Sequence, residues 1–138
     1  MKKGRNFAVI SVALMFLALT MAVSQTHAME LKAGLDVKGQ WKRGDDIGVF
    51  ARLKIFSIEG NKARLAYAVG RFGYDEITKD SFDEINGEVS ESSPGVKVVK
   101  FTGGKSLADF VFIFNPGTPF VRGSWTSTRN RTWQIEMK

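Results

Sequence analysis

The chain is poor in the side chains that most often carry out nucleophilic, acid–base or metal chemistry. It has one histidine, His27, and no cysteine. Histidine is the commonest general base and metal ligand, and cysteine provides thiol nucleophiles and structural zinc ligands. His27 also lies in an N-terminal segment that resembles a secretory signal and would be cleaved. We therefore expect a protein that is not an enzyme, with no catalytic residues, no cofactor and no metal.

Carboxylates are the remaining candidates for catalysis or for a metal site. Residues 75–91 contain seven acids against a single base, Lys79; the acids are Asp75, Glu76, Asp80, Asp83, Glu84, Glu88 and Glu91. Paired carboxylates hydrolyse glycosides only where their surroundings separate the two pKa values, and a polar exposed segment does not do so. The ligand order of an EF-hand is also absent. The pattern favours a solvated acidic surface, with an acidic protein-binding loop as the alternative.

Aromatic and arginine side chains offer the best binding chemistry in the chain. Flat rings flanked by hydrogen-bonding groups suit sugars and flat apolar ligands. We predict a ligand-binding rim made of Arg71, Phe72, Tyr74, Arg122 and Trp125. Aromatic residues that alternate along strands are more often core residues, and this is the interpretation for Tyr67 and Trp133.

Apolar and polar residues alternate with a period of two along most of the chain after residue 28, which indicates β-strands. About eight strands are predicted, at residues 37–41, 47–58, 63–70, 82–90, 96–101, 107–114, 120–127 and 132–137. Short turns such as Glu59-Gly60-Asn61 join consecutive strands. This order predicts an all-β antiparallel meander that closes as a small barrel, with a two-sheet β-sandwich as the alternative.

The predicted strand at residues 107–114 is apolar on both faces. Phenylalanines 110, 112 and 114 share one side, and Val111 and Ile113 share the other. A neighbouring segment would cover the second side, and residues 73–82, with a helical turn, are the candidate. The alternative is a protein partner or a homodimer that docks on Val111 and Ile113.

The first 28 residues have the features of a cleaved, helical signal peptide. Three basic residues begin the segment, and an apolar run spans residues 7–22. Thr26-His27-Ala28 then provides a cleavage site that ends in a small residue, Ala28. A membrane anchor is the alternative, although the apolar run is short for one. The expected mature protein is a single domain of residues 29–138, secreted or periplasmic, with no membrane span after cleavage. Cleavage removes Lys2, Lys3 and Arg5 from the 20 basic residues, leaving 17 against 14 acids, so we expect no nucleic-acid partner.

Two short patterns carry a resemblance to a known family. Gly39-Gln40-Trp41 lies on the first predicted strand, and Arg129 and Arg131 precede the last. In this arrangement the chain resembles the calycin barrels, the lipocalin and avidin type. The resemblance implies a ligand-binding barrel in which Trp41 closes the floor and the guanidinium of Arg129 or Arg131 stacks on its indole.

The chain also resembles small, uncharacterised bacterial exported domains. The likeness rests on the Gly39 strand, on the hairpin Ile58-Glu59-Gly60-Asn61-Lys62-Ala63 and on Gly123-Ser124-Trp125. No activity comes with it. The expected function is non-catalytic binding of a small apolar or glycan ligand at the open end of an exported β-barrel. The alternative is a protein-interaction module, such as an enzyme inhibitor or envelope assembly factor. It would use the predicted strand at residues 107–114, which is apolar on both faces, or the acidic segment at residues 75–91.

Overall fold

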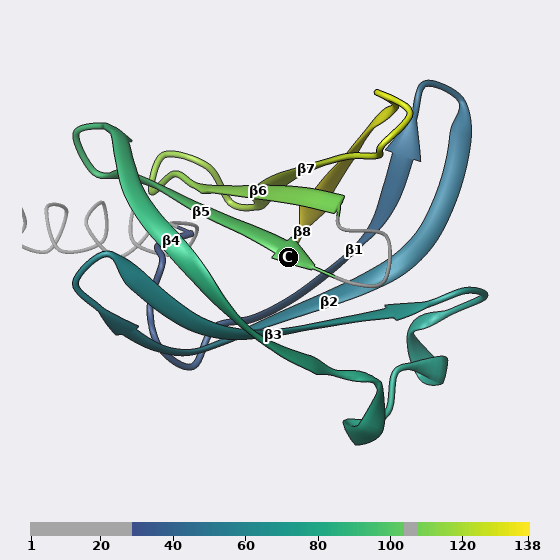
Figure 1. Ribbon diagram of the computed structural model, residues 1–138, viewed down its shortest axis with the longest axis horizontal. Helices are drawn as coiled ribbons and strands as arrows, with labels where there is room; N and C mark the ends of the chain where they lie inside the picture. Colours follow the sequence, from purple (N-terminus) through teal and green to yellow (C-terminus); the bar gives the residue numbers. More distant parts are fainter. Residues whose placement is uncertain (1–28, 104–107) are drawn as a thin grey trace, which may run out of the picture.

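Eight antiparallel strands form a closed barrel in the computed structural model, which describes residues 29–103 and 108–138 (Figure 1). The strands follow one another around the barrel in chain order: β1 (Asp36–Arg43), β2 (Asp46–Glu59), β3 (Lys62–Gly70), β4 (Asp83–Ser93), β5 (Val96–Gly103), β6 (Ala108–Phe114), β7 (Val121–Thr126) and β8 (Thr132–Met137). The predicted meander and barrel are confirmed, and the sandwich alternative is wrong. The predicted signal peptide lies outside the described residues.

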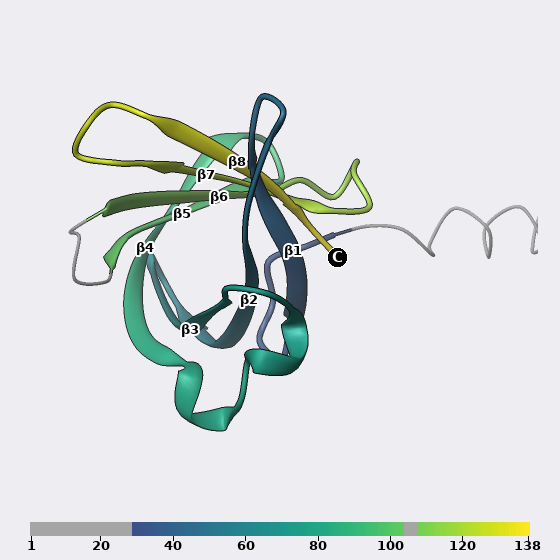
Figure 2. The ribbon, with the colours of Figure 1, turned by 90° about the vertical axis from the view of Figure 1, so that its right-hand side faces the viewer.

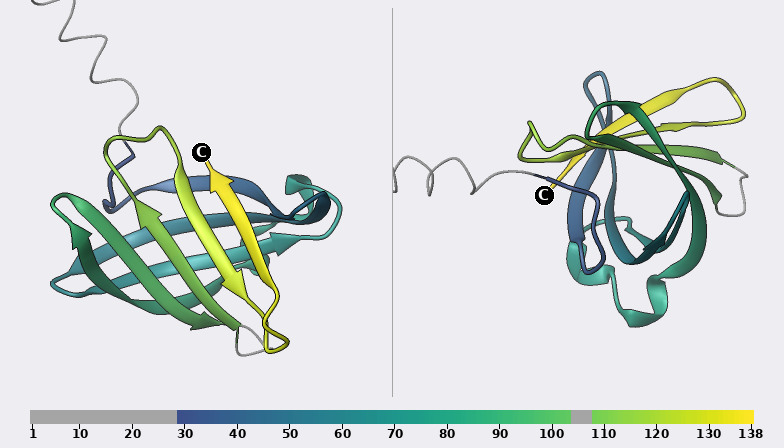
Figure 3. Two further views of the ribbon diagram at one scale, coloured as in Figure 1. Left: turned by 90° about the horizontal axis from the view of Figure 1, so that it is seen from above. Right: turned by 90° about the vertical axis from the view of Figure 1, so that its left-hand side faces the viewer.

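Alternation along the strands separates the barrel interior from its outer surface. On β6, the three phenylalanines point into the core, while Val111 is half-buried and Ile113 is 36% exposed on the outer face. Strand β2 contributes Ala51, Leu53 and Ile55 to the same core. Seen from above, β5 to β8 lie side by side and form one wall of the barrel (Figure 3). The alternation of apolar and polar residues along each strand therefore determines which side chains point into the barrel.

The barrel closes where β1 meets β8. Lys38 and Lys138 exchange backbone hydrogen bonds of 3.0 Å in both directions, and Lys42 pairs with Gln134. Gly39 lies between these two points, and a Cβ atom there would collide with the backbone carbonyl oxygen of Glu136. Glycine at this position lets the last strand approach the first closely enough to complete the barrel.

The two ends of the barrel differ. At one end, which we call the mouth, β1 turns into β2, β3 leads towards β4, and β7 turns into β8 (Figure 1, right-hand side). Figure 2 views the molecule from this end. At the opposite end, Met29, Leu31 and Leu35 pack against the core, and the Met29 N–H donates to the carbonyl oxygen of Thr118 at 3.1 Å. The N-terminal residues thus fill the end away from the mouth.

The connection between β3 and β4 folds over the outside of the barrel. It contains two short 3₁₀ helices, η1 (Tyr74–Glu76) and η2 (Lys79–Ser81), which confirms the predicted helical turn. The Tyr74 ring lies 4.8 Å from that of Phe50 on β2, and the Lys54 ammonium lies 4.5 Å above the Phe82 ring. The segment therefore covers β2 and β3, and our prediction that it covers Val111 and Ile113 is wrong. The outward-facing alanines of β3 present the flat surface on which it packs.

Candidate functional site

A cavity of about 270 Å³ opens at the mouth of the barrel. Its lining comes from β1, β2, β3, η2, β4, β6 and β7: Trp41, Val49, Tyr67, Ala68, Val69, Ser81, Asp83, Ile85, Phe110 and Trp125. Strand pairing explains its position. The ladder between β3 and β4 ends at Tyr67 and Asp83, while β3 runs on to Gly70. The end of β3, which pairs with β2 but no longer with β4, therefore forms one edge of the entrance, and the start of β4 forms the other.

Aromatic rings form the inner wall of the cavity. The Trp41 ring lies 6.1 Å from Phe110 and 6.4 Å from Trp125, both in edge-to-face contact. Phe110 stacks on Trp125 at 6.2 Å and packs against Tyr67 at 5.0 Å. Each ring packs against at least one other ring, so the wall is formed without a ligand. Binding to a preformed wall avoids the entropy cost of ordering side chains.

Polar groups are few in this wall, and one of them, the Tyr67 hydroxyl, has a proton left to donate. Trp41 Nε1–H donates to Tyr67 Oη at 2.8 Å, and this bond leaves the hydroxyl proton of Tyr67 free to donate. Trp125 Nε1 is buried and has no hydrogen-bond partner within residues 29–103 and 108–138. A buried donor without an acceptor costs about 1–3 kcal/mol. This unsatisfied donor is enclosed by the packed wall, because Nε1 has almost no accessible surface.

Burial keeps the Tyr67 hydroxyl neutral even in alkaline solution. It raises the pKa of Tyr67 well above the usual value, and the hydrogen bond from Trp41 offsets only part of that rise. The entrance, by contrast, is polar and acidic, because Ser81 and the exposed Asp83 form its edge on η2 and β4. The cavity thus has a neutral hydrogen-bond donor, the Tyr67 hydroxyl, in its interior and the carboxylate of Asp83 at its rim.

No family model, curated protein or solved structure matches this chain. The described residues contain no group of three or more His, Cys, Asp or Glu that could hold a metal ion. In the same part of the chain, no helix has the length and apolar character needed to cross a membrane.

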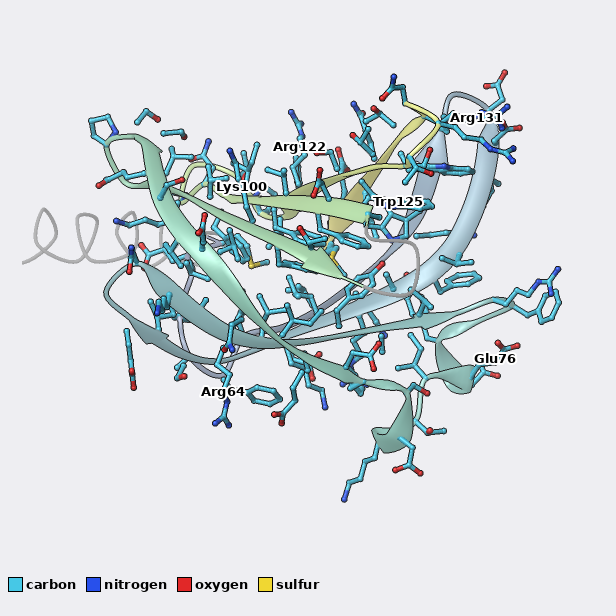
Figure 4. The ribbon with its side chains drawn as sticks, viewed as in Figure 1. Arg64, Glu76, Lys100, Arg122, Trp125 and Arg131 are labelled. Atoms are coloured by element: carbon cyan, nitrogen blue, oxygen red, sulfur yellow. The ribbon has the colours of Figure 1, made fainter. Side chains whose placement is uncertain are left out.

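The structure does not bring the five predicted rim residues together. Trp125 lines the cavity and lies at the mouth end of β7 (Figure 4). Arg71 and Phe72 are exposed beyond the end of β3, with the guanidinium 5.4 Å from the ring. Tyr74 and Arg122 line a separate outer groove across the β1–β8 seam. Only one of the five predicted residues therefore belongs to the cavity.

The predicted closure by Trp41 and an arginine is also rearranged. Trp41 is 2% exposed and lies near the mouth, among the rings of the cavity wall, rather than at the filled end. Arg129 and Arg131 are exposed in the turn between β7 and β8, and Figure 4 shows Arg131 at its tip. Among the described residues, the arginine over an indole is Arg43, at 5.2 Å from Trp133. The predicted stacking on Trp41 is wrong, because the long β7–β8 turn carries both arginines away from the barrel interior.

Most residues that line the cavity are not among the binding residues predicted from the sequence. Tyr67 was interpreted as a core residue and Phe110 as one of three core phenylalanines, whereas both lie where the core meets the cavity. The one available signal was the Tyr67 hydroxyl, a polar group on the otherwise apolar inward face of β3. Val49, Val69 and Ile85 carried no signal that distinguishes a cavity wall from a packed core.

The raised pKa of Tyr67 makes a prediction about stability in alkali. Tyrosine in the unfolded chain ionises at about pH 10, whereas folded Tyr67 holds its proton to higher pH. The contribution of this difference is fully present below about pH 10 and is lost as the pH rises through the folded value. Urea unfolding between about pH 9 and 11 should therefore show a shallower loss of stability for Tyr67→Phe than for the wild type. Parallel losses in the two proteins would contradict the burial of this hydroxyl.

Proposed function

We propose that the protein is a non-catalytic, exported β-barrel that binds a small apolar or glycan ligand in the cavity at its mouth. The observation that carries the proposal is the apolar cavity at the mouth, whose inner wall is made of the packed rings of Trp41, Phe110 and Trp125. A concave apolar site with a small number of placed polar groups is typical of small-molecule binding. The opposite end of the barrel is filled by Met29, Leu31 and Leu35, which leaves the mouth as the route of entry.

Two further elements of the proposal rest on sequence. The basic start and apolar run of residues 1–28 support export with cleavage after Ala28, to the periplasm or the medium. The eight-stranded meander is compatible with a calycin-type barrel, and Gly39-Gln40-Trp41 on β1 supports kinship with lipocalin and avidin barrels. A small closed barrel of this kind provides a fixed scaffold for a ligand at one end.

A protein-interaction module is the second candidate function. Its support is the apolar outer face of β6, where Ile113 is 36% exposed beside the half-buried Val111. A partner on this face would be displaced by Val111→Lys, and such a change would leave the cavity on the inner side of the sheet intact. The two candidates therefore predict different sensitive residues.

Filling the mouth should weaken ligand binding without unfolding the protein. Val69 lines the cavity and is 47% exposed, so a phenylalanine there has room to extend across the entrance. We expect Val69→Phe to weaken binding of the neutral aromatic ketone 2-acetylnaphthalene by at least about tenfold, a loss of about 1.4 kcal/mol. Isothermal titration calorimetry on the two proteins provides the measurement.

The matched control is the same substitution on the outer surface. Val111→Phe adds the same ring to β6 on the face away from the cavity. Its affinity for the ketone should equal that of the wild type. Equal affinities in all three proteins would place the ligand elsewhere and overturn the proposal.

A further inference from the structure

The charged group at the entrance of the cavity indicates the chemical class of the ligand. We infer that the cavity binds a compact organic cation, in which an apolar body carries an alkylated ammonium group that has the aromatic rings as its surroundings and the Asp83 carboxylate as its counter-ion. This inference rests on the proposed function, since it specifies which small molecule enters the same cavity.

The register of β4 directs the Asp83 side chain towards the cavity. Asp83 pairs with Tyr67 across the β3–β4 ladder. Successive side chains of a strand point to opposite faces, so Asp83 shares the inward face with Ile85, and both residues line the cavity. Glu84 pairs with Ala66 and does not line the cavity, because it lies on the outer face. The two neighbouring carboxylates of β4 therefore have different surroundings.

No positively charged side chain of the lining neutralises Asp83, because the lining contains neither lysine nor arginine. Within residues 29–103 and 108–138, no ion pair includes Asp83. Lys54 lies on the outer face, in register with Ala66 and therefore with Glu84, and its ammonium lies 4.5 Å above the Phe82 ring. The carboxylate at the entrance is thus available to a cationic ligand.

The aromatic rings next to this carboxylate favour the same charge on the ligand. Tyr67, directly opposite Asp83, and Trp125 both line the cavity and are only half-buried. The π-electrons of an aromatic ring attract cations, and this attraction is stronger where water is excluded. An anion would be repelled by Asp83 and would lose its hydration without gaining a cationic partner. The rings and the carboxylate therefore select for positive charge.

Hydrogen-bond acceptors in the lining are too few for a primary ammonium group. Such a group has three donors, and each needs an acceptor once water is removed. The Tyr67 oxygen already accepts from Trp41 at 2.8 Å, and the Ser81 hydroxyl oxygen accepts from the Thr78 N–H at 3.0 Å. Among the side chains of the lining, Asp83 is the acceptor not already engaged in this way. An ammonium group with alkyl substituents needs no acceptors, and its methyl groups suit an apolar wall.

The volume of the cavity limits the apolar body of the ligand. It is about 270 Å³, just below the range of roughly 300–1,000 Å³ typical of drug-sized ligands. Val49, Val69 and Ile85 add aliphatic surface to the aromatic wall. These dimensions suit a single ring that carries a trimethylammonium group.

A pair of probes with the same shape tests the inference. Phenyltrimethylammonium and tert-butylbenzene differ at one atom, because a charged nitrogen in the first takes the place of the quaternary carbon in the second. We expect the wild type to bind the cation about tenfold more tightly at low ionic strength, and added salt should narrow this difference. Isothermal titration calorimetry provides the measurement.

Two neighbouring substitutions locate the counter-ion. Asp83→Asn removes the charge from the inward face of β4 but keeps the shape of the side chain. It should lower the affinity for phenyltrimethylammonium about tenfold and leave that for tert-butylbenzene unchanged. Glu84→Gln is the matched control, because it removes the same charge one residue away on the outer face, and it should keep the wild-type affinities. Both side chains are exposed, so both variants are expected to fold.

The outcomes separate the inference from the proposed function. Equal affinities of the wild type for the cation and the hydrocarbon, both weakened by Val69→Phe, would overturn the inference and leave the proposed function standing. An equal loss of cation affinity in Asp83→Asn and Glu84→Gln would also overturn the inference, because it would show attraction to the acidic surface as a whole. Failure of 2-acetylnaphthalene and both probes to bind, or binding that Val69→Phe does not weaken, would overturn both.

Discussion

Phe112→Ala is expected to lower the free energy of unfolding by about 4 kcal/mol, the largest loss from any single truncation proposed for this barrel. The Phe112 side chain is fully buried and packs 5.7 Å from the Phe101 ring and 6.1 Å from the Trp41 ring. Removing a buried phenylalanine costs about 3–5 kcal/mol, because the lost contacts and the remaining void both destabilise the folded state. Urea unfolding at neutral pH provides the measurement.

Phe56→Ala is the matched control for this substitution. Phe56 is 39% exposed, and its main described partner is the Arg64 guanidinium, 5.4 Å away. A loss of under about 1 kcal/mol is expected for a half-exposed ring with one cationic contact. Comparable losses in the two variants would show that Phe112 is not at the centre of the core.

Gly39→Ala is expected to cost about 3 kcal/mol and to loosen the seam between β1 and β8. An added Cβ would meet the backbone oxygen of Glu136 and lie 3.0 Å from the Ile135 side chain. Backbone cannot move aside as a side-chain end can, so β8 must shift outward. Overpacking typically costs about 1–3 kcal/mol, and a forced shift of a strand lies at the upper end. Hydrogen exchange of the Lys38 and Lys138 amides, which bond across this seam, should accelerate in the variant.

Gly87→Ala separates the effect of the seam from that of any added methyl group. Its Cβ would meet Val99 Cγ1 at 2.8 Å and Leu65 Cδ2 at 3.2 Å, and both are side-chain atoms rather than backbone, so neither strand of the β1–β8 seam has to shift. We expect a smaller loss of about 1 kcal/mol and unchanged exchange at the β1–β8 seam. If Gly87→Ala accelerates exchange of the Lys38 amide as much as Gly39→Ala does, the account of barrel closure is wrong.

Local patterns were enough to predict the strands and their connections. Period-two alternation at Phe110, Phe112 and Phe114 predicted the inward face of β6, and the structure confirms it. Gly60 adopts a positive φ of 59°, which is the conformation that the predicted turn between β2 and β3 requires. Such features depend on neighbours a few residues away, and the sequence displays those neighbours directly.

The position of the site depended on contacts between distant residues. Trp41 and Tyr67 are 26 residues apart and meet only once the barrel has closed. Trp41 would be buried both at the closed end of the barrel and near the mouth, so its expected burial did not distinguish the two positions. The packing of residues 71–82 against Phe50 and Lys54 was also not predictable from the sequence. The apolar outer face of β6 and the flat alanine face of β3 are both plausible surfaces for this segment.

Gly39 and Trp41 are both important in the structure, but not for the reason that the family resemblance implied. Gly39 and Trp41 were linked through a family resemblance, whereas the structure gives each a separate physical role. Gly39 makes room for the backbone of β8, and Trp41 forms part of the cavity wall. Trp125, predicted as a residue of the binding rim, lines the cavity with its ring, while its Nε1 is enclosed in the packed wall.

The central claim is that the mouth cavity binds a small molecule, and native mass spectrometry on protein purified gently from its own host tests it most directly. The wild type is predicted to carry a small-molecule adduct that is released on denaturation, and the adduct should persist in Val111→Phe and be lost or much reduced in Val69→Phe. A protein that carries no adduct, or an adduct retained equally by Val69→Phe, would contradict the claim.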